Sequence, residues 1–438
     1  LSKAVLTNIV KCREMENRDK EFYSKLQVAG SIKFVVGEES DEIIGLKRPK
    51  LTNNEKFSRN LATILARKGE VVAVNLTTYP NYCVIYISKN GNWLKMDYEY
   101  IKKIQEFMVR ISKYEPMTWE EAFKKNDTKA LSANVIAYCS EKFDSRLRKL
   151  RRDIRDGKDD QCIQSFLEYA SNSVNIYNVK ASKIIISRVC CYYYKKVSKN
   201  VETPKEFLKH LKKVGSYMRA LIDITSCACN EKYKDLFSNM KLHILKTIIT
   251  YQPIFSWRNI IQRFILDLTE YENFKNVCLN DMIKADRLAV IYDDVENLEL
   301  ESIKKRVCLH AEMNILNEII NQKKKTRAYI AVSKKCCYLC ELYIKFAQEQ
   351  GYNIVISGTH KKIYNLWKLP SLTDVSFKNN FLSYALKELD RIIQEEIVDT
   401  SCLLPESVDS NQVKVDDHEN NANLDFELSD IQSFLTYK

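Results

Sequence analysis

The sequence predicts an α/β protein, with a mixed α+β N-terminal part, a helical middle and a C-terminal layered α/β unit. Only 9 glycines and 7 prolines occur in 438 residues, which favours long helices over turn-rich sheets. Apolar residues recur three and four positions apart through the middle of the chain, as in amphipathic helices. After about residue 285, short apolar runs alternate with helical spacing, which is typical of layered α/β units.

Residues 1–113 form the predicted mixed region. Two segments there have helical spacing, and three have a pattern that favours strands. The predicted helices are 58–67 and 98–112, and the predicted strands are 71–77, 83–88 and 93–97. An Asn-Gly pair at 90–91 marks a turn before the last of these strands, so we expect a hairpin.

Residues 114–284 are predicted to be helix after helix, including the segment 242–249, and no repeat of fixed period occurs. Residues 285–395 then alternate between strands and helices. The predicted strands are 288–294, 298–303, 327–333 and 352–357, and the predicted helices are 307–323, 337–350 and 379–395. Gly351 suits the position just after a helix. The acidic tail at 396–438 is rich in Asn and Ser, and we expect it to be disordered.

Charge is distributed unevenly along the chain. From Glu395 to Lys438 there are eleven acidic residues and two lysines, a net charge of −9. The rest of the chain must therefore carry +21, because the whole chain has a net charge of +12. A basic body with an acidic tail indicates a polyanionic partner, and the tail would compete for the same surface. The alternative is that the basic charge only keeps the protein soluble, and charge alone does not decide between the two.

Fourteen cysteines occur in a chain with no apolar run of membrane-spanning length and no signal-peptide pattern at its start. We therefore expect a soluble intracellular protein, cytoplasmic or nuclear, without a membrane partner. Its cysteines should remain thiols or bind metal. The sequence does not determine the oligomeric state.

Three residues have the types and spacing of metal ligands. His310 lies where a helical pattern begins, and 27 residues later Cys337 and Cys340 stand three apart at the start of another predicted helix. One imidazole and two thiolates supply three zinc ligands and leave the fourth position open, as in catalytic zinc sites. His310 and Glu312 can both reach one metal only if their helix points at it end-on. Both helices would then direct their N-termini at the metal, which favours thiolates.

Glu312 has no need to be a ligand in this arrangement. Zinc lowers the pKa of a bound water to about 7, and a nearby carboxylate can take that proton and return it to a substrate. The sequence therefore predicts that Glu312 is a general acid and base.

The whole pattern, His-Ala-Glu at 310–312 followed by Cys-x-x-Cys at 337–340, resembles the zinc-dependent cytidine deaminase superfamily. The segment SGTHKKIYNLWKLP, residues 357–370, is similar to a divergent nucleic-acid-deaminase-like branch known mostly from fungi and intracellular bacteria. The resemblance covers about 110 residues, roughly 285–395, and does not reach the region before them.

This resemblance implies a three-layer α/β/α domain with a mixed sheet. It implies that His310, Cys337 and Cys340 hold zinc and that Glu312 shuttles a proton. The reaction of the superfamily is hydrolytic deamination at C4 of cytosine or C6 of adenine, with loss of ammonia.

Two features depart from the family pattern. Cys336 stands where the family usually has proline, so Cys336 is an alternative ligand to Cys337. No fifth strand is evident after Pro370. A structural zinc site closed by a fourth ligand is a further alternative, although it leaves Glu312 without a role. The candidate fourth ligands are Cys308, Cys336 and His360.

Two segments combine features that suit a nucleic-acid substrate. The loop after the strand at 352–357 interleaves aromatic rings with lysines, which suits base stacking and phosphate contacts. Its candidate substrate-binding residues are His360, Lys361, Lys362, Tyr364 and Trp367. The second segment is one face of a predicted helix, formed by Arg148, Arg151, Arg152 and Arg155. The alternatives are rings packed under the loop and a solvated basic face.

We therefore expect a zinc-dependent hydrolase that acts on the C–N bond of a cyclic amidine and converts cytosine to uracil in single-stranded nucleic acid. An unpaired base is the easier target, because extrusion from a duplex costs a few kcal/mol. One alternative is a deaminase of free nucleosides or nucleotides. Another is a non-catalytic module that binds nucleic acid or protein and keeps zinc for stability. The sequence does not distinguish cytosine from adenine or DNA from RNA.

Overall fold

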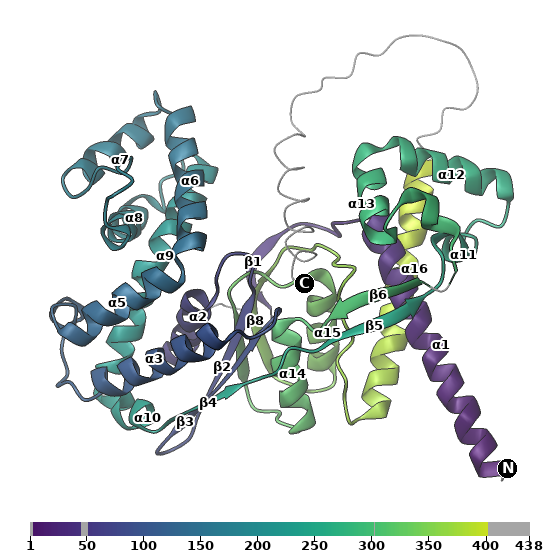
Figure 1. Ribbon diagram of the computed structural model, residues 1–438, viewed down its shortest axis with the longest axis horizontal. Coiled ribbons are helices and arrows are strands. Elements are labelled where there is room, and N and C mark those ends of the chain that lie inside the picture. Colours follow the sequence, from purple (N-terminus) through teal and green to yellow (C-terminus); the bar gives the residue numbers. More distant parts are fainter. Residues whose placement is uncertain (1–2, 45–50, 302, 402–438) are drawn as a thin grey trace. The chain divides into compact units, whose positions relative to one another are not determined.

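The computed structural model describes residues 3–44, 51–301 and 303–401 (Figure 1). These residues form two compact units, and each unit is assembled from segments that are separated in the sequence. Unit 1 draws on Leu1–Gly45, Ile248–Arg327 and Lys335–Lys438, and unit 2 draws on Leu46–Thr247 and Ala328–Lys334. The four consecutive regions predicted from the sequence do not follow this division, and their limits stay a prediction.

Unit 2 contains strands in the order β7-β2-β3-β4. They are β2 (Val72–Thr78), β3 (Cys83–Lys89), β4 (Met240–Ile244) and β7 (Ala328–Val332). β2 and β3 form an antiparallel hairpin, β4 lies parallel beside β3, and β7 lies antiparallel beside β2. The Tyr79 N–H donates to the Tyr82 carbonyl at 2.9 Å and closes the hairpin turn. The strands predicted at 71–77 and 83–88 are confirmed, and the sheet is mixed. The predicted hairpin is wrong, because 83–88 pairs with the strand before it and not with 93–97.

The other elements of unit 2 are helical. They are α2 (Asn53–Leu65), α3 (Lys95–Ile111), α4 (Trp119–Ala122), α5 (Asn126–Tyr138), α6 (Ser140–Asp156), α7 (Gln161–Ser171), α8 (Lys183–Val197), α9 (Lys205–Ala228), η1 (Glu231–Tyr233) and α10 (Lys234–Ser238). Helix α2 begins where the sequence supplies a capping box, because Thr52 and Glu55 each bond the other's backbone N–H. α8 and α9 pack closely, since a Cβ on Gly215 would lie 2.7 Å from the backbone of Cys191.

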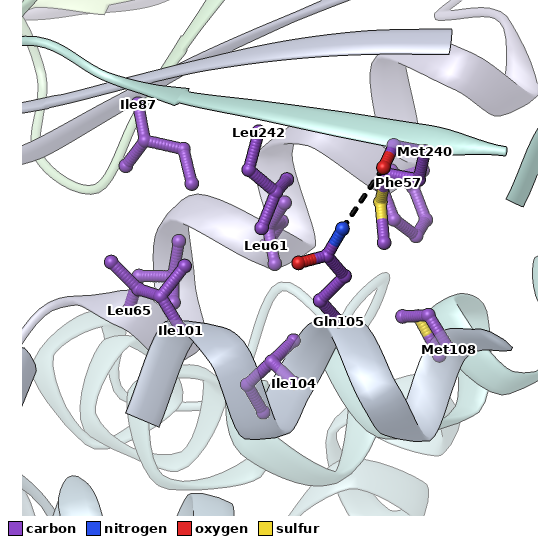
Figure 2. A pocket seen from close by; sticks show the side chains of 10 residues that line it. All are labelled: Phe57, Leu61, Leu65, Ile87, Ile101, Ile104, Gln105, Met108, Met240 and Leu242. Atoms are coloured by element: carbon purple, nitrogen blue, oxygen red, sulfur yellow. Dashed lines mark hydrogen bonds between the residues drawn. The ribbon is translucent and has the colours of Figure 1, made fainter. Parts of the chain in front are cut away.

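A pocket lies where α2 and α3 face β3 and β4 (Figure 2). It is almost entirely apolar, and its lining residues are Phe57, Leu61, Leu65, Ile87, Ile101, Ile104, Gln105, Met108, Met240 and Leu242. The Gln105 side chain donates to the Met240 carbonyl at 2.9 Å. Met240 and Leu242 both face these helices (Figure 2). Because side chains alternate along a strand, their neighbours Lys241 and His243 point to the opposite face of the sheet.

Unit 1 contains two antiparallel strand pairs and a set of helices. β5 (Ile249–Ile254) pairs with β6 (Ile303–Cys308), and β1 (Ser40–Ile44) pairs with β8 (Ile354–Thr359). The helices are α1 (Lys3–Ile32), α11 (Trp257–Ile261), α12 (Leu268–Asn280), α13 (Met282–Tyr292), η2 (Val295–Glu299), α14 (Ala311–Asn321), α15 (Tyr338–Glu349) and α16 (Val375–Ser401). α1 lies along α16 (Figure 1), and Lys25 of α1 forms an ion pair with Asp390 of α16 at 2.6 Å.

The predicted order of helix, strand, helix and strand in the C-terminal part is confirmed by α14, β7, α15 and β8. Gly351 follows α15 with a φ of +86°, a left-handed conformation that glycine adopts without strain. The predicted α/β fold class is therefore confirmed. Within the described residues, no helix has the length and apolar character needed to cross a bilayer.

Several predicted elements are wrong in type. Residues 288–294 were expected as a strand but belong mostly to helix α13, because a short apolar run fits a buried helix equally well. Of the strand predicted at 298–303, Leu298 and Glu299 belong to η2, and Ile303 is the first residue of β6. Residues 93–97 do not form a strand, since α3 starts at Lys95, where the Asp97 carboxylate accepts the Leu94 N–H. The predicted helix 242–249 is instead the end of β4 and the start of β5.

Other predicted boundaries are shifted. The helix expected at 307–323 begins only at Ala311, because β6 occupies the residues up to Cys308. The last helix is longer than 379–395 and continues to Ser401, so the expected tail starts too early. The rest of that tail, 402–438, lies outside the described residues. The strand that pairs with β8 is β1, from the N-terminal region, and not a segment after Pro370.

Candidate metal centre

His310 stands at the junction between strand β6 and helix α14. Its backbone is extended, with φ −63° and ψ 149°, and it is the N-cap residue of α14. The imidazole therefore projects from the N-terminal end of α14 and does not lie along the side of the helix. His310 and Glu312 can consequently approach one point although they are only two residues apart, as the end-on arrangement requires.

Cys337 occupies the same position on the next helix. It is the N-cap of α15, and its Sγ accepts the backbone N–H of Cys340 at 3.4 Å. Cys337 is 2% exposed and Cys340 is fully buried. Two helix N-termini thus face the same place, and their partial positive charge favours anionic sulfur.

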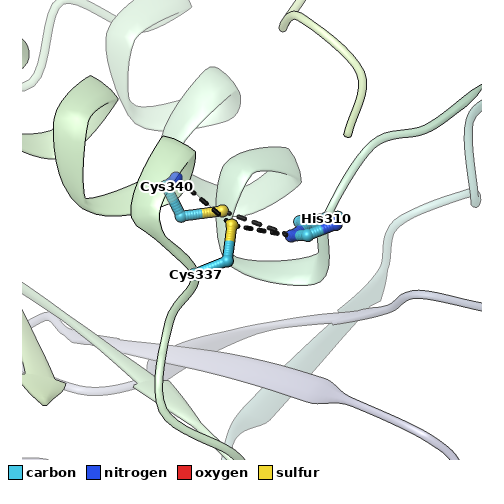
Figure 3. A group of neighbouring side chains, drawn as sticks. All are labelled: His310, Cys337 and Cys340. Atoms are coloured by element: carbon cyan, nitrogen blue, oxygen red, sulfur yellow. Dashed lines mark hydrogen bonds between the residues drawn. The ribbon is translucent and has the colours of Figure 1, made fainter. Parts of the chain in front are cut away.

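The three predicted ligands converge (Figure 3). His310 Nδ1 lies 3.5 Å from Cys337 Sγ and 3.3 Å from Cys340 Sγ. One ligand atom from each of these buried residues lies within 4.8 Å of the others. One imidazole and two thiols at such distances fit zinc, whose bonds to nitrogen and sulfur are about 2.0–2.3 Å long. Among the described residues, no fourth His, Cys, Asp or Glu joins this group.

Cys336 and Cys308 are buried next to the group but bond elsewhere. The Cys336 Sγ donates to the Gly358 carbonyl at 3.2 Å, and the Cys308 Sγ donates to the Leu309 carbonyl at 3.5 Å. The structure thus places Cys337 in the group and gives Cys336 another partner. The alternative in which Cys336 is the ligand finds no support in this geometry.

Electrostatics within the group separate the two thiols. Burial alone would raise the pKa of Cys337, but hydrogen bonding with Cys340 and the nearby His310 outweigh burial and hold it well below its usual range. Burial and the Cys337 sulfur raise the pKa of Cys340 well above its usual range. Burial tends to lower the pKa of His310, but Cys337 outweighs it, so that pKa is raised. These opposite shifts favour a thiolate at Cys337 and a thiol at Cys340.

Metal affinity should decrease as the pH falls. Binding needs a thiolate at Cys340 and a neutral His310, and both pKa values are raised, so metal must displace protons from both when both are protonated. Where only Cys340 carries its proton, affinity should fall about tenfold per pH unit, and about 100-fold per unit once His310 is protonated too. Competition with a chromophoric chelator across the pH range measures this slope. A flat profile would contradict the proton displacement.

Glu312 lies in the first turn of α14 and is 3% exposed. Burial raises the pKa of its carboxyl, and the neighbouring His310 offsets only part of that rise. Its interactions with His310, Cys337 and Cys340 show that the carboxyl borders the three ligands. A buried carboxyl with a raised pKa beside a metal group can both accept and return a proton near neutral pH.

The loop that follows β8 reaches the same site. The His360 N–H donates to the Cys336 carbonyl at 3.1 Å. The Tyr364 ring lies edge-on to the rings of His310 and His360, with centroids 6.0 and 5.4 Å away. His360 and Tyr364 are both partly exposed, so they border the ligands and also reach solvent.

The two lysines predicted to bind substrate, Lys361 and Lys362, are already engaged. Lys361 has a φ of +57°, and its Nζ contacts both carboxylate oxygens of Glu341 at 2.7 and 2.8 Å. Lys362 lies over the Phe34 ring at 5.0 Å. Glu341 directly follows Cys340 in α15 and is 4% exposed. Glu341 is not among the residues predicted from the sequence, although an acidic residue beside a ligand in the first turn of a helix is a signal for it.

Helix α1 and the residues after it hold this loop. The Gln27 side chain donates to the Asn365 carbonyl at 2.7 Å, and the Leu369 N–H donates to the Tyr23 hydroxyl at 3.2 Å. The Ile363 N–H donates to the Phe34 carbonyl at 2.8 Å. The N-terminal segment is therefore part of the structure that shapes the site.

Trp367 corrects one expectation about this loop. It is fully buried, so no base can stack on it, and its Nε1 donates to Cys340 Sγ at 3.2 Å. Its ring packs against Phe22, Tyr343 and Phe381. Trp367 thus contacts a candidate ligand without being one itself. Its N–H donor stabilises negative charge on the Cys340 sulfur.

Replacing Trp367 with Phe should weaken metal binding by about 10–100-fold, the usual effect of losing an outer partner of a ligand. Phenylalanine keeps an aromatic ring in the core, and only the pyrrole part of the indole, with its N–H, is lost. The matched control is Trp257→Phe, because Trp257 is equally buried and its Nε1 has no hydrogen-bond partner among the described residues. Metal dissociation constants of both variants measure the effect. Equal affinities in the two variants would contradict the role of the N–H.

The four predicted arginines lie on helix α6 of unit 2. Arg148, Arg152 and Arg155 are exposed. Arg151 is engaged differently, since its guanidinium donates to the carbonyls of Ile176 and Asn178 at 2.8 and 3.4 Å. Three of the four predicted residues therefore remain accessible to a polyanion, and Arg151 tethers a loop.

Comparison with known proteins agrees with this site. Residues 309–371 match the model of a family described as OTT_1508-like deaminase, and the matched segment begins one residue before His310 and includes Trp367. Comparison with curated proteins found no match, and neither did comparison with solved structures. The family match and the His-Cys-Cys group together confirm the resemblance seen in the sequence: residues 309–371, which contain all three converging residues, are similar to a deaminase-like family.

Proposed function

We propose that this protein is a zinc-dependent hydrolase that deaminates a nucleobase, with cytosine in single-stranded nucleic acid as its preferred substrate. One observation carries the proposal: a buried carboxyl, Glu312, borders a group of three buried zinc-type ligands that lacks a fourth ligand among the described residues. A purely structural zinc site is normally closed by four protein ligands. The match of residues 309–371 to a deaminase family supports the same reaction class.

Each residue of the site would have a distinct role in the reaction. His310, Cys337 and Cys340 would hold the zinc, and Trp367 would stabilise the charge on Cys340. When bound, zinc would lower the pKa of a water molecule to about 7. Glu312 would accept a proton from water and donate it to the ring nitrogen. It would then accept the second proton, from the hydroxyl added to the ring carbon, and donate it to the amine, which leaves as ammonia. Its raised pKa suits both steps, because a carboxyl that is too acidic would not return the proton.

The surroundings of the site support a nucleobase in a nucleic-acid strand as the substrate. Tyr364 and His360 present partly exposed rings next to His310, which suits stacking against a base. The net charge of +12 and the exposed Arg148, Arg152 and Arg155 favour a polyanionic polymer. We propose an intracellular location, where single strands occur.

A deaminase of free nucleosides or nucleotides is the second candidate. It is favoured by the engagement of Lys361 with Glu341 and by the burial of Trp367, which leave fewer groups in the loop for a polymer backbone. Salt distinguishes the two, because polymer affinity should fall steeply with added salt and mononucleoside turnover should not.

The test is incubation of the purified full chain with four substrates: cytosine- and adenine-containing single strands, cytidine and adenosine. Mass spectrometry then measures conversion with and without a chelator. We expect chelator-sensitive conversion of cytosine in the strand. Conversion of cytidine alone would support the second candidate. Absence of conversion by the fully metal-loaded protein would favour a non-catalytic module.

A further inference from the structure

A row of aromatic and basic side chains lies on the face of β3 and β4 that points away from α2 and α3. Lys241 is registered with Val84, and His243 with Tyr86, in the parallel pair. Met240 and Leu242 face the helices (Figure 2), so Lys241 and His243 face outward, and both are exposed. We call Tyr82, Tyr86, Lys241 and His243 the tyrosine–lysine strip.

The rings of the strip are held flat in stacked pairs. Tyr86 stacks on His243 with centroids 5.2 Å apart and planes 28° apart. Tyr79 stacks on Tyr82 at 4.6 Å and 8°, and the Lys241 Nζ lies 4.8 Å from the centre of the Tyr82 ring. Tyr82 and Tyr86 are four residues apart in extended chain, so their Cα atoms are separated by roughly 13 Å. The two stacked pairs therefore follow one another along the strand.

Further aromatic rings lie past the end of β4. The Trp93 indole donates to the Leu245 carbonyl at 2.8 Å and lies 6.1 Å from the ring of Tyr98. Tyr98 is 47% exposed, and Lys246 after β4 is exposed as well. Tyr98 belongs to α3, which packs on the other face of the sheet, so these rings are not part of the strip.

We propose that the tyrosine–lysine strip binds single-stranded nucleic acid by stacking bases on its rings. Flat rings with interleaved cations suit unpaired bases and their phosphates, and such stacking does not depend on sequence. A duplex hides the faces of its bases. An apolar protein partner would need exposed aliphatic side chains, whereas Val84, in the middle of the strip, is 8% exposed. β4 is the last strand in the order of unit 2, so no described strand extends the sheet beyond Lys241 and His243.

This inference rests on the proposed function in one respect, the choice of a single-stranded polymer as substrate. The strip itself lies in unit 2 and contains no residue of the metal centre. Its test therefore uses a strand that the proposed reaction cannot change. Oligothymidylate and oligouridylate contain neither cytosine nor adenine, so binding is measured without turnover.

The experiment compares two double variants of the full chain. Tyr82→Ala with Lys241→Ala removes one ring and one cation from the strip. Tyr251→Ala with Lys304→Ala removes an exposed tyrosine and an exposed lysine from the strand pair β5 and β6, and serves as the matched control. Fluorescence anisotropy measures binding to labelled strands of about 20 nucleotides, longer than a typical stacking site. Circular dichroism checks that both variants fold.

We expect the strip variant to bind roughly ten- to 100-fold more weakly than wild type, with a salt slope smaller by about 0.7 for the lost phosphate contact. The control variant should bind like wild type. An equal loss in both variants, or no loss in the strip variant, would overturn the inference and leave the proposed function intact. Failure of wild type to bind either strand would also overturn it, while conversion of cytidine would still test the metal centre. If the strip variant does not fold, His243→Ala provides the same comparison.

Discussion

Replacing Glu312 with Gln should lower the rate of deamination by about 10²–10⁴-fold, the usual contribution of a general acid and base. Glutamine has nearly the same shape, but its amide cannot accept a proton and return it. The carboxyl is 3% exposed and is not one of the three converging ligands, so folding and zinc content should survive. Single-turnover rates and metal analysis of the same sample measure both properties.

The matched control is Glu318→Gln, which makes the same change later in α14. Glu318 is partly exposed and bonds the Gln322 side chain at 2.7 Å, away from the ligands. It should retain wild-type rates. If Glu312→Gln deaminates as fast as this control, Glu312 is not the proton carrier. If Glu312→Gln also loses zinc, the carboxyl supports the metal and its role must be reassigned.

Replacing Cys337 with Ser should remove the metal. Cys337 is one of the three converging residues, and its pKa is held well below its usual range, which favours the thiolate that zinc binds. A serine hydroxyl does not ionise near neutral pH and is a poor zinc ligand. Affinity should fall by more than the ~10–100-fold that follows the loss of an outer partner. Metal stoichiometry after gel filtration and competition with a chelator measure this loss.

Cys336→Ser is the control for this prediction, because Cys336 is adjacent, equally buried and bonded to the Gly358 carbonyl. A serine there can make the same hydrogen bond, so full metal content should remain. The opposite result, with metal lost in Cys336→Ser and kept in Cys337→Ser, would show that the neighbouring thiol is the ligand. Thermal unfolding with and without metal separates loss of binding from loss of fold.

The core of the site could be predicted from the sequence because its signals are local. His310 and Cys337 each precede a helix as its N-cap, so two short motifs already determine where their side chains point. Trp367 shows the limit. Its hydrogen bond to Cys340 joins residues 27 apart through a loop, and no periodic pattern records such a contact.

The fold was predictable where elements are long and periodic, and least so where pairing is remote. Strands β2 and β3 follow from the alternation of apolar residues, whereas the Asn-Gly pair at 90–91 indicated a hairpin on the wrong side of β3. The pairing of β1 with β8 joins Ser40 to Thr359, and a short polar strand carries no sign of so distant a partner. The segment at 288–294 was ambiguous for another reason: seven apolar-rich residues suit a buried helix as well as a strand.

Contacts of α1 and β1 with β8 and its following loop have a practical consequence for anyone who trims this chain. A minimal fragment beginning near residue 285 would keep all three metal ligands and Glu312. It would lose Tyr23, Gln27 and Phe34, whose bonds fix the backbone at 363–369, and it would uncover the edge of β8. An uncovered strand edge invites aggregation. Aggregation or inactivity of such a fragment would reflect the loss of these contacts. It would say nothing about the chemistry of the intact protein.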